Sequence, residues 1–262
     1  MRILSWNVNG IRAAERKGLL EWIRREQPDI LSLQETKAHP EQLSEALREP
    51  AGYYAYFAPA ERRGYSGLAV YSRAKPESVR RLGVPRFDSE GRVLILEYPR
   101  FVFVSAYFPN SQDGGRRLEY KLEFCDSLLA AIDELVASAG RVVLSGDYNI
   151  AHRPIDLARP EENEGNAGYL PEERAWMDRF TGSGYVDTFR AFTPEPHHYT
   201  WWSYRAGARR RNVGWRIDYH CVNEAFLPCV ERSLIRPEVQ GSDHCPVELV
   251  LRTPEAPDGT DD

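Results

Sequence analysis

The stretch Val142-Val143-Leu144-Ser145-Gly146-Asp147-Tyr148-Asn149 joins a strand pattern to two polar side chains. Its first three residues, apolar and mostly β-branched, predict a buried strand. Gly146 permits a tight exit, so Asp147 and Asn149 are expected at the carboxyl edge of the strand, where open α/β sheets place their sites. A carboxylate that deprotonates water and an amide that holds a phosphate oxygen suit metal-assisted hydrolysis. A turn closed by an Asx side chain accounts for the same residues.

Composition indicates a soluble globular protein. The chain has 262 residues, of which 42% are hydrophobic and 28% charged, enough for one large domain or two small ones. No apolar run approaches the roughly 20 residues of a membrane span, and no signal peptide is visible. The net charge of −5 does not indicate a nucleic-acid binder, although local patches decide binding.

The cysteines are few and widely spaced, at Cys125, Cys221, Cys229 and Cys245. They show neither Cys-x-x-Cys spacing nor the density of a disulfide scaffold, so we interpret them as reduced, with no zinc site. The expected location is intracellular and cytoplasmic.

Hydrophobic patterns predict more strands than helices. The strands are expected at 2–6, 30–34, 53–57, 67–71, 92–97, 101–107, 142–144, 200–204, 215–222 and 247–251. Helices are expected at about 15–27, along the apolar face from Leu118 to Val136, and from Pro171 to about 182. Hairpins mixed with crossovers favour an α/β (α+β) fold, a pair of mixed sheets with helices outside. One domain is expected over 1–252, followed by a flexible acidic tail at 253–262.

The two halves of the chain echo one another faintly. Leu4-Ser5-Trp6-Asn7-Val8 is similar to Leu144-Ser145-Gly146-Asp147-Tyr148-Asn149-Ile150. We therefore expect two sheets of related design that face each other.

Polar groups of similar kind stand at six element ends or within them. Each alone is explained as a turn residue, a salt bridge or a packed histidine. Six of them together, without a disulfide or a metal cage, favour one catalytic site. They are Asn7 with Asn9, Glu35, Tyr107 with Asn110, Asp147 with Asn149, Asp218, and Asp243 with His244.

Seven blocks that cover nearly the whole chain carry a family resemblance. They are Trp6-Asn7-Val8-Asn9-Gly10-Ile11-Arg12, Leu33-Gln34-Glu35-Thr36-Lys37, Gly64-Tyr65-Ser66-Gly67, Tyr107-Phe108-Pro109-Asn110, Gly146-Asp147-Tyr148-Asn149, Asn212-Val213-Gly214-Trp215-Arg216-Ile217-Asp218-Tyr219 and Gly241-Ser242-Asp243-His244-Cys245-Pro246. The series resembles the motifs of the exonuclease III family of apurinic/apyrimidinic endonucleases, in the DNase I-like superfamily. That resemblance implies a four-layered sandwich of two mixed β-sheets flanked by helices.

The resemblance also implies catalytic roles. Asp147 matches the residue that orients and deprotonates the attacking water, and Asn149 matches the amide that holds that water or the phosphate. His244 matches a phosphate-binding histidine, kept cationic by its carboxylate partner Asp218. Tyr107 matches a tyrosine near the scissile phosphate.

A metal cofactor is implied as well. Glu35 matches the principal ligand of Mg²⁺, for which Mn²⁺ can substitute, and Asn7, Asp147 and Asp243 match further groups near it. Asn7 also counts among the catalytic residues. A sparse protein site suits magnesium, which keeps waters and phosphate oxygens as ligands. Asn9 stands where some members carry Asp, which leaves a ligand there open.

The implied partner is double-stranded DNA. The arginine-rich loop that precedes Trp215 is interpreted as a phosphate contact rather than an idle solvated run. The predicted DNA-binding residues are Arg205, Arg209, Arg210, Arg211, Asn110, Tyr65, Lys37, Asn163 and Asn166. A monomer associated with the nucleoid is expected.

A small apolar pocket for the lesion is expected between Trp201, Trp215 and Ile217. An abasic nucleotide has no base, so it flips out cheaply into such a pocket. The alternative is that the tryptophans are core residues. We favour the core for Trp202 and the pocket for Trp215.

These features predict a DNA-repair nuclease that cleaves 5′ to abasic sites, leaves a 3′-hydroxyl, and trims 3′ ends as a 3′–5′ exonuclease. One rival is a phosphoinositide phosphatase or sphingomyelinase of the same superfamily, against which the arginine loop and the Asn212–Trp215 block argue. Another is a non-catalytic nucleic-acid binder, which needs no carboxylates such as Glu35 and Asp147 near phosphate.

Overall fold

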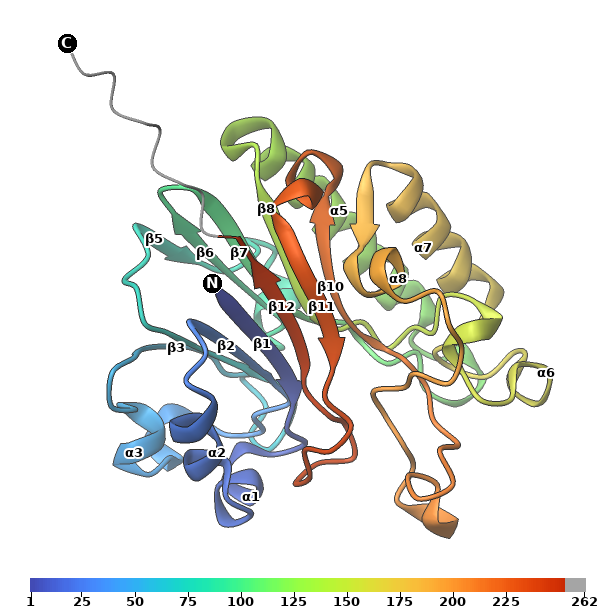
Figure 1. Ribbon diagram of the computed structural model, residues 1–262, viewed down its shortest axis with the longest axis horizontal. Helices are drawn as coiled ribbons and strands as arrows, with labels where there is room; N and C mark the ends of the chain where they lie inside the picture. The colour runs from blue at the N-terminus through green and yellow to red at the C-terminus, as the bar shows by residue number, and fades with distance from the viewer. Residues whose placement is uncertain (253–262) are drawn as a thin grey trace.

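Two sheets packed face to face make the body of the molecule (Figure 1). The structure is a computed structural model that describes residues 1–252, so the predicted acidic tail at 253–262 lies outside the described residues. Each sheet is mixed and six-stranded, and helices cover its outer face. The four-layered fold class is confirmed, whereas one domain over 1–252 stays a prediction.

The first sheet is assembled from both ends of the chain. Its order is β11-β12-β1-β2-β4-β3, with β1 and β2 parallel and every other pair antiparallel. Both β2 and β4 are buried on both faces, as the apolar runs in their sequences predict. The strands are β1 (Arg2–Asn7), β2 (Ile30–Gln34), β3 (Tyr54–Ala58), β4 (Leu68–Ser72), β11 (Val230–Ile235) and β12 (Val247–Leu251).

The second sheet comes from the middle of the chain. Its order is β5-β6-β7-β8-β10-β9, and only β7 and β8 are parallel. Gly146 has φ +148° in β8, and a Cβ there would lie 1.8 Å from the carbonyl oxygen of Ala106 on β7. The strands are β5 (Ser78–Arg80), β6 (Val93–Tyr98), β7 (Phe101–Tyr107), β8 (Val142–Asp147), β9 (Tyr185–Asp187) and β10 (Asp218–Asn223).

The helices divide between the two outer faces. Those packed on the first sheet are α1 (Ile11–Arg16), α2 (Leu19–Glu26) and α3 (Glu45–Arg48). The second sheet carries α4 (Pro85–Asp88), α5 (Leu118–Ala139) and α7 (Pro171–Gly182). The remaining helices are the short α6 (Pro160–Asn163) and α8 (Thr188–Phe192). None of the helices in residues 1–252 is long and apolar enough to cross a membrane.

The echo between the halves is a repeat of topology. Read outward from β1 and from β8, both sheets show the same sequence of parallel and antiparallel pairs. β1 lies parallel to β2 and antiparallel to β12, as β8 lies parallel to β7 and antiparallel to β10. The prediction of two facing sheets of related design is confirmed.

Several element predictions need correction. The helix predicted at about 15–27 is two helices, because Gly18 adopts a left-handed conformation between α1 and α2. The strand predicted at 200–204 is wrong, since only Trp201 forms isolated bridges there. The strand predicted at 215–222 begins at Asp218 instead. Three strands, β5, β9 and β11, were not predicted, because two have three residues and β11 alternates poorly.

A polar seam joins the sheets inside the apolar core. The hydroxyls of Ser32 and Ser105 lie 2.6 Å apart across it. His220 on β10 contacts the Ser145 hydroxyl at 2.6 Å through Nδ1 and the carbonyl oxygen of Val247 on β12 at 3.1 Å through Nε2. These partners assign a neutral ring with its proton on Nε2. Burial lowers the pKa of His220 to about 4.

This histidine makes stability depend on pH. The unfolded imidazole binds a proton near pH 6.5 and the folded one only near 4, so its contribution is complete above pH 6.5 and is lost as pH falls. From about pH 7 to about pH 5 we expect the contribution of His220 to the free energy of unfolding to fall by ~2 kcal/mol. Urea unfolding at both pH values measures it as the difference between wild type and His220→Gln. The variant keeps a donor and an acceptor but does not titrate, so equal losses in both proteins would contradict the assignment.

Candidate active site

A cleft of about 460 Å³ opens where β1, β2, β7 and β8 end. Most of the predicted site residues line it: Asn7, Glu35, Tyr65, Tyr107, Asn110, Asp147, Asn149, Trp201, Trp215, Ile217, Asp243 and His244. Asp218 lies beside His244, at the start of β10. The cleft does not include Lys37, Asn163, Asn166, Arg205, Arg209, Arg210 or Arg211.

Matching turns shape both central strand ends. After β1, the Asn9 amide donates to Asn7 Oδ1 at 3.0 Å, and after β8 the Asn149 amide donates to Asp147 Oδ1 at 2.8 Å. Asn9 and Asn149 both adopt the left-handed conformation, with φ of 47° and 51°. Asparagine tolerates that conformation and its side chain closes such turns. The two turns meet, since Asn7 Nδ2 donates to Asp147 Oδ2 at 2.8 Å.

Asp147 is a buried carboxylate with an unusual proton affinity. Its burial and the neighbouring charge of Asp218 raise its pKa to about 7, against the opposing effects of His244 and of the Asn7 and Asn149 hydrogen bonds. A carboxylate with this pKa can accept a proton near neutral pH.

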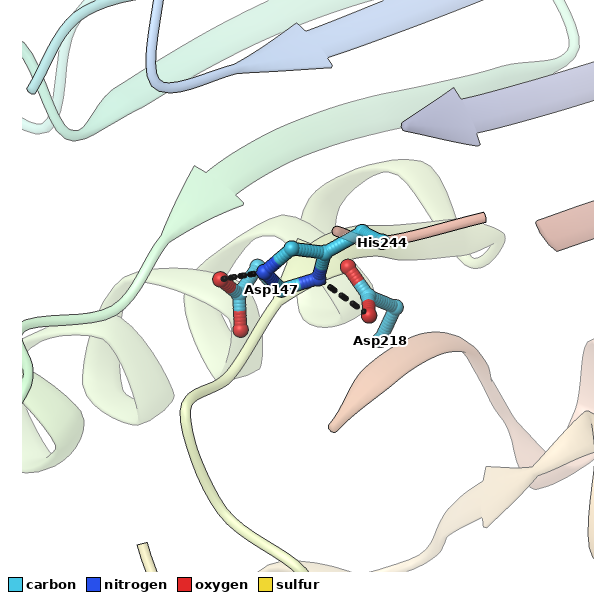
Figure 2. Close-up of side chains that lie close together, drawn as sticks. All are labelled: Asp147, Asp218 and His244. Atoms are coloured by element: carbon cyan, nitrogen blue, oxygen red, sulfur yellow. Dashed lines mark hydrogen bonds and ion pairs between the residues drawn. The ribbon is translucent and has the colours of Figure 1, made fainter. Parts of the chain in front are cut away.

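His244 stands between the two aspartates (Figure 2). Its Nδ1 contacts Asp218 Oδ2 at 2.9 Å, and its Nε2 lies 3.9 Å from Asp147 Oδ2. Burial disfavours the imidazolium, but Asp218, Asp147 and Asp243 together raise the pKa of His244 to about 10. The ring is therefore a cation at neutral pH.

Glu35 and Tyr107 also line the cleft, and Tyr107 on β7 is the register partner of Asp147 on β8. The Tyr107 hydroxyl donates to Glu35 Oε1 at 2.6 Å, and Lys37 Nζ lies 3.6 Å from the same oxygen. Burial, followed by the charges of Glu35 and Asp147, holds the pKa of Tyr107 well above its usual value. Tyr107 is thus a neutral hydrogen-bond donor.

Asn9 links Lys37 to Asp243. Its Oδ1 accepts from Lys37 Nζ at 2.6 Å, and its Nδ2 donates to Asp243 Oδ1 at 3.0 Å. A carboxylate at position 9 could not donate to Asp243, so the amide fits this place. Asp243 also accepts from Trp201 Nε1 at 3.1 Å and from the Ser242 hydroxyl.

The remaining wall is apolar. Trp201 and Trp215 pack edge to face, with ring centroids 6.3 Å apart, and buried Ile217 packs in the same cluster. Gly168 completes this wall, where a Cβ would lie 3.3 Å from Trp215 and 3.1 Å from the Asn149 carbonyl oxygen. Trp202, in contrast, is buried outside the cleft, as predicted for a core residue.

Comparison with known proteins identifies the family of this chain. A sequence model of the endonuclease/exonuclease/phosphatase family matches residues 4–244. The chain belongs to that family. It is 44% identical to the exodeoxyribonuclease of Bacillus subtilis (strain 168) over 254 residues, which are 96% of this chain and 99% of that protein.

Two further relatives narrow the type of nuclease. The DNA-(apurinic or apyrimidinic site) endonuclease of Dictyostelium discoideum is 39% identical over 255 residues, 96% of this chain and 70% of that protein. The solved structure of the AP endonuclease LMAP from Leishmania major superposes with a TM-score of 0.86 at 31% identity, covering 97% of this chain and 88% of that one. This family member is a nuclease of the AP endonuclease and exodeoxyribonuclease III type.

Two arginines of this nuclease's cleft were not predicted. Arg92, almost fully buried, donates to the Tyr107 carbonyl oxygen at 3.0 Å and to the Tyr65 hydroxyl at 2.9 Å. Arg117 donates to the same hydroxyl at 2.6 Å, and Glu90 pairs with both arginines. Neither arginine stands in a motif block, so only folding brings them to Tyr65.

The arginine loop is only partly available to a ligand. The guanidinium of Arg209 donates to the carbonyl oxygens of Ser242, Pro237 and Val239 and lies 4.7 Å from the Trp202 ring centroid. Arg209 therefore makes structural contacts, and its role as a DNA contact stays a prediction. Exposed side chains remain at Arg205, Arg210 and Arg211.

A cluster of three residues and one separate carboxylate suit a metal ion. Ligand atoms of Asp147, Asp218 and His244 all lie within 4.8 Å of one another. A protonated imidazole has no lone pair for a metal, however, so His244 joins such a site only after losing its proton. Glu35 offers carboxylate oxygens, which are hard donors. Its Oε2 is available, because it accepts no hydrogen bond from the residues that the structure describes. A cation that needs few protein oxygens fits there.

The charge of His244 depends on Asp218 in a testable way. An opposite charge this close raises a pKa by about 1–3 units, so Asp218→Asn should lower the pKa of His244 by ~2 units. The variant retains an acceptor for Nδ1. NMR titration of the metal-free protein measures the shift, with the His220 ring as an internal control. If the pKa of His244 does not move, Asp147 and not Asp218 keeps the imidazole charged.

Proposed function

We propose that this nuclease hydrolyses the phosphodiester 5′ to an abasic site in duplex DNA and leaves a 3′-hydroxyl. We also propose 3′–5′ exonuclease and 3′-end trimming activity. One observation supports this most: a proton acceptor, a buried cation and an apolar wall line the same cleft, at Asp147, His244 and Trp215. The Bacillus relative is named as an exodeoxyribonuclease and the Dictyostelium relative as an apurinic or apyrimidinic site endonuclease.

Asp147 is the proposed general base. With a pKa of about 7 it takes a proton from water at the pH where it is itself half ionised, which is the favourable condition for general-base catalysis. Asn7 and Asn149 fix its two oxygens. Asn149 Oδ1 accepts from Asn110, and its Nδ2 donates to the Phe108 carbonyl oxygen, so the amide is held at the cleft wall.

His244 and Tyr107 are proposed to receive the phosphate. The imidazolium neutralises charge that develops on the phosphoryl oxygens, an effect of ~3–4 kcal/mol in comparable sites. The hydroxyl of Tyr107, which donates to Glu35 in this structure, is proposed to turn to a phosphate oxygen when the substrate binds. Asp218 serves them indirectly, because it keeps His244 charged and oriented.

Glu35 is the proposed magnesium ligand, with Asn7 and Asp147 near it, and manganese is the expected substitute. The ion, when bound, supplies positive charge to a phosphate oxygen. Asp243 was expected beside it. Because Asp243 already accepts bonds from Asn9, Ser242 and Trp201, we assign it to the wall of the cleft instead.

The DNA surface is proposed to extend outward from the cleft. Tyr65, held by Arg92 and Arg117, and Asn110 lie at the cleft itself. The exposed arginines of the 205–211 loop, together with Lys37, Asn163 and Asn166, are the proposed outer phosphate contacts. Such contacts position a duplex without reading its sequence. We propose that the active form is a monomer.

The central test is a duplex with one tetrahydrofuran abasic analogue. We expect nicking 5′ to it with Mg²⁺, none in EDTA, and recovery when Mg²⁺ returns. Glu35→Gln should bind the duplex almost normally and lose most turnover. Asp147→Asn and His244→Ala should each lose ~10²–10³-fold in kcat.

The rival functions give different results in the same assay. Full activity in EDTA would remove the metal from the mechanism. Losses below tenfold in both Asp147→Asn and His244→Ala would place the chemistry elsewhere. Turnover of phosphoinositides or sphingomyelin without nicking would favour a phosphoinositide phosphatase or sphingomyelinase. Binding of the duplex without any turnover would favour a non-catalytic nucleic-acid binder.

Selectivity for the lesion is proposed to come from the size of the apolar pocket. Flipping an intact nucleotide costs a few kcal/mol more than flipping an abasic one, and a small pocket adds to that difference. Trp215→Ala enlarges the pocket, so the ratio of kcat/KM for abasic over normal nucleotides should fall. Trp202→Ala is the matched control, because Trp202 is buried outside the cleft.

That control separates packing from selection. Trp202→Ala should lower the melting temperature and leave the ratio unchanged. If Trp215→Ala behaves in the same way, Trp215 is a core residue and the pocket assignment is wrong.

A further inference from the structure

A fully buried ion pair lies behind the cleft. Lys121 on α5 and Glu173 on α7 have completely inaccessible side chains, and Lys121 Nζ lies 2.6 Å from Glu173 Oε1. No motif block contains either residue, and neither lines the cleft. Replacing such a pair by neutral residues is often close to neutral for stability, so stability alone does not account for it.

Lys121 holds the turn that carries Asn149. Its ammonium donates to the Asn149 carbonyl oxygen at 2.7 Å. On the other side of the same residue, the Asn149 amide donates to Asp147 Oδ1 at 2.8 Å. Asn149 has φ of 51°, a left-handed conformation that asparagine tolerates better than most residues and that the surrounding contacts hold in place. Lys121 supplies one of these two hydrogen bonds to the Asn149 backbone, while Asn110 and Phe108 hold its side chain.

Glu173 holds the loop that forms the apolar end of the cleft. Its Oε2 accepts from the amides of Gly168 at 2.7 Å and Leu170 at 3.0 Å. Its Oε1 also accepts from the Ser111 hydroxyl, next to Asn110. The loop is tied back to the catalytic segment by the Ala151 amide, which donates to the Gly168 carbonyl oxygen at 2.8 Å.

Lys121 therefore contacts one wall of the cleft, at Asn149, and Glu173 contacts another, at the Gly168 loop. Gly168 lies so close to both Trp215 and the Asn149 carbonyl oxygen that a single added carbon would be crowded at 3.1–3.3 Å. The loop therefore has little room to move against either Trp215 or Asn149. Misplacement of about 1 Å at a reacting group costs ~10²-fold in rate.

We infer that Lys121 and Glu173 are positioning residues that fix the Asn149 turn against the Gly168 loop and thereby couple catalytic geometry to the size of the lesion pocket. The inference rests on the proposed function for its kinetic readout. It also predicts a structural coupling that does not depend on any activity.

The test is the double variant Lys121→Met/Glu173→Gln. It leaves no unpaired buried charge and keeps an oxygen for the loop amides, but it removes the donor to Asn149. We expect kcat on the tetrahydrofuran duplex to fall ~10–10²-fold, with KM changed less than about threefold. The ratio of abasic to normal cleavage should fall with it.

Glu248→Gln is the matched control. Glu248 is a buried carboxylate that pairs with Arg2 and Arg236, lies on β12, and does not line the cleft. It should lower the melting temperature without changing kcat or the ratio. An equal fall in kcat at an equal melting temperature in both variants would overturn the inference, as would wild-type kinetics in the double variant.

Amide hydrogen exchange gives the readout that needs no substrate. In the double variant the amides of Asn149, Ala151 and Gly168 should exchange at least about tenfold faster, whereas those of Val143 and Leu144 in β8 should not change. Unchanged exchange at all five amides would also overturn the inference. If the wild type does not nick abasic duplexes but the exchange shift is present, the proposed function fails and the coupling stands.

Discussion

Two carboxylates buried side by side impose the central constraint on this molecule. Asp147 and Asp218 are register partners on adjacent strands, and both are almost inaccessible to water. Two such charges cannot both persist without compensation. His244 supplies the compensating charge, and the Asn7 amide of the other sheet supplies a hydrogen bond. Asn7 lies on β1 of the first sheet and His244 lies just before β12, whereas the two aspartates belong to the second sheet. The charge balance of the site therefore depends on the face-to-face packing of the two sheets.

The residues at strand ends could be predicted from sequence because two local signals coincide there. An apolar run followed by Asp147 and Asn149 marks both a buried strand and its exit, and the same holds for Asn7. Other parts of the site carry no local signal. The sequence patterns around Arg92 and Arg117 predict only a strand and a helix. They do not indicate that both side chains contact Tyr65. Arg209 turns inward because it donates to three carbonyl groups that lie 28 to 33 residues later in the chain. The spacing of residues within a motif cannot reveal such contacts.

The repeated topology explains how a catalytic edge arises between two sheets. Each sheet brings the carboxyl ends of its parallel pair to the same place, and each central strand continues into an Asx turn with a left-handed asparagine. The chemistry differs between the copies. The first sheet places an amide, Asn7, where the second places the carboxylate of Asp147. The site therefore has one buried proton acceptor here instead of two, and the neutral copy becomes a hydrogen-bond donor to the charged one.

Gly146 has a consequence for efforts to change this enzyme. The carbonyl oxygen of Ala106 occupies the volume that any side chain at position 146 would need, one residue before Asp147, the proposed general base. Variant libraries aimed at new substrates should therefore leave β8 untouched and diversify Trp201 and Trp215. Gly168 should also stay, because a Cβ there would crowd Trp215 and the Asn149 carbonyl oxygen. The strand that carries Asp147 is fixed by backbone contact, whereas the wall formed by the two tryptophans can be redesigned.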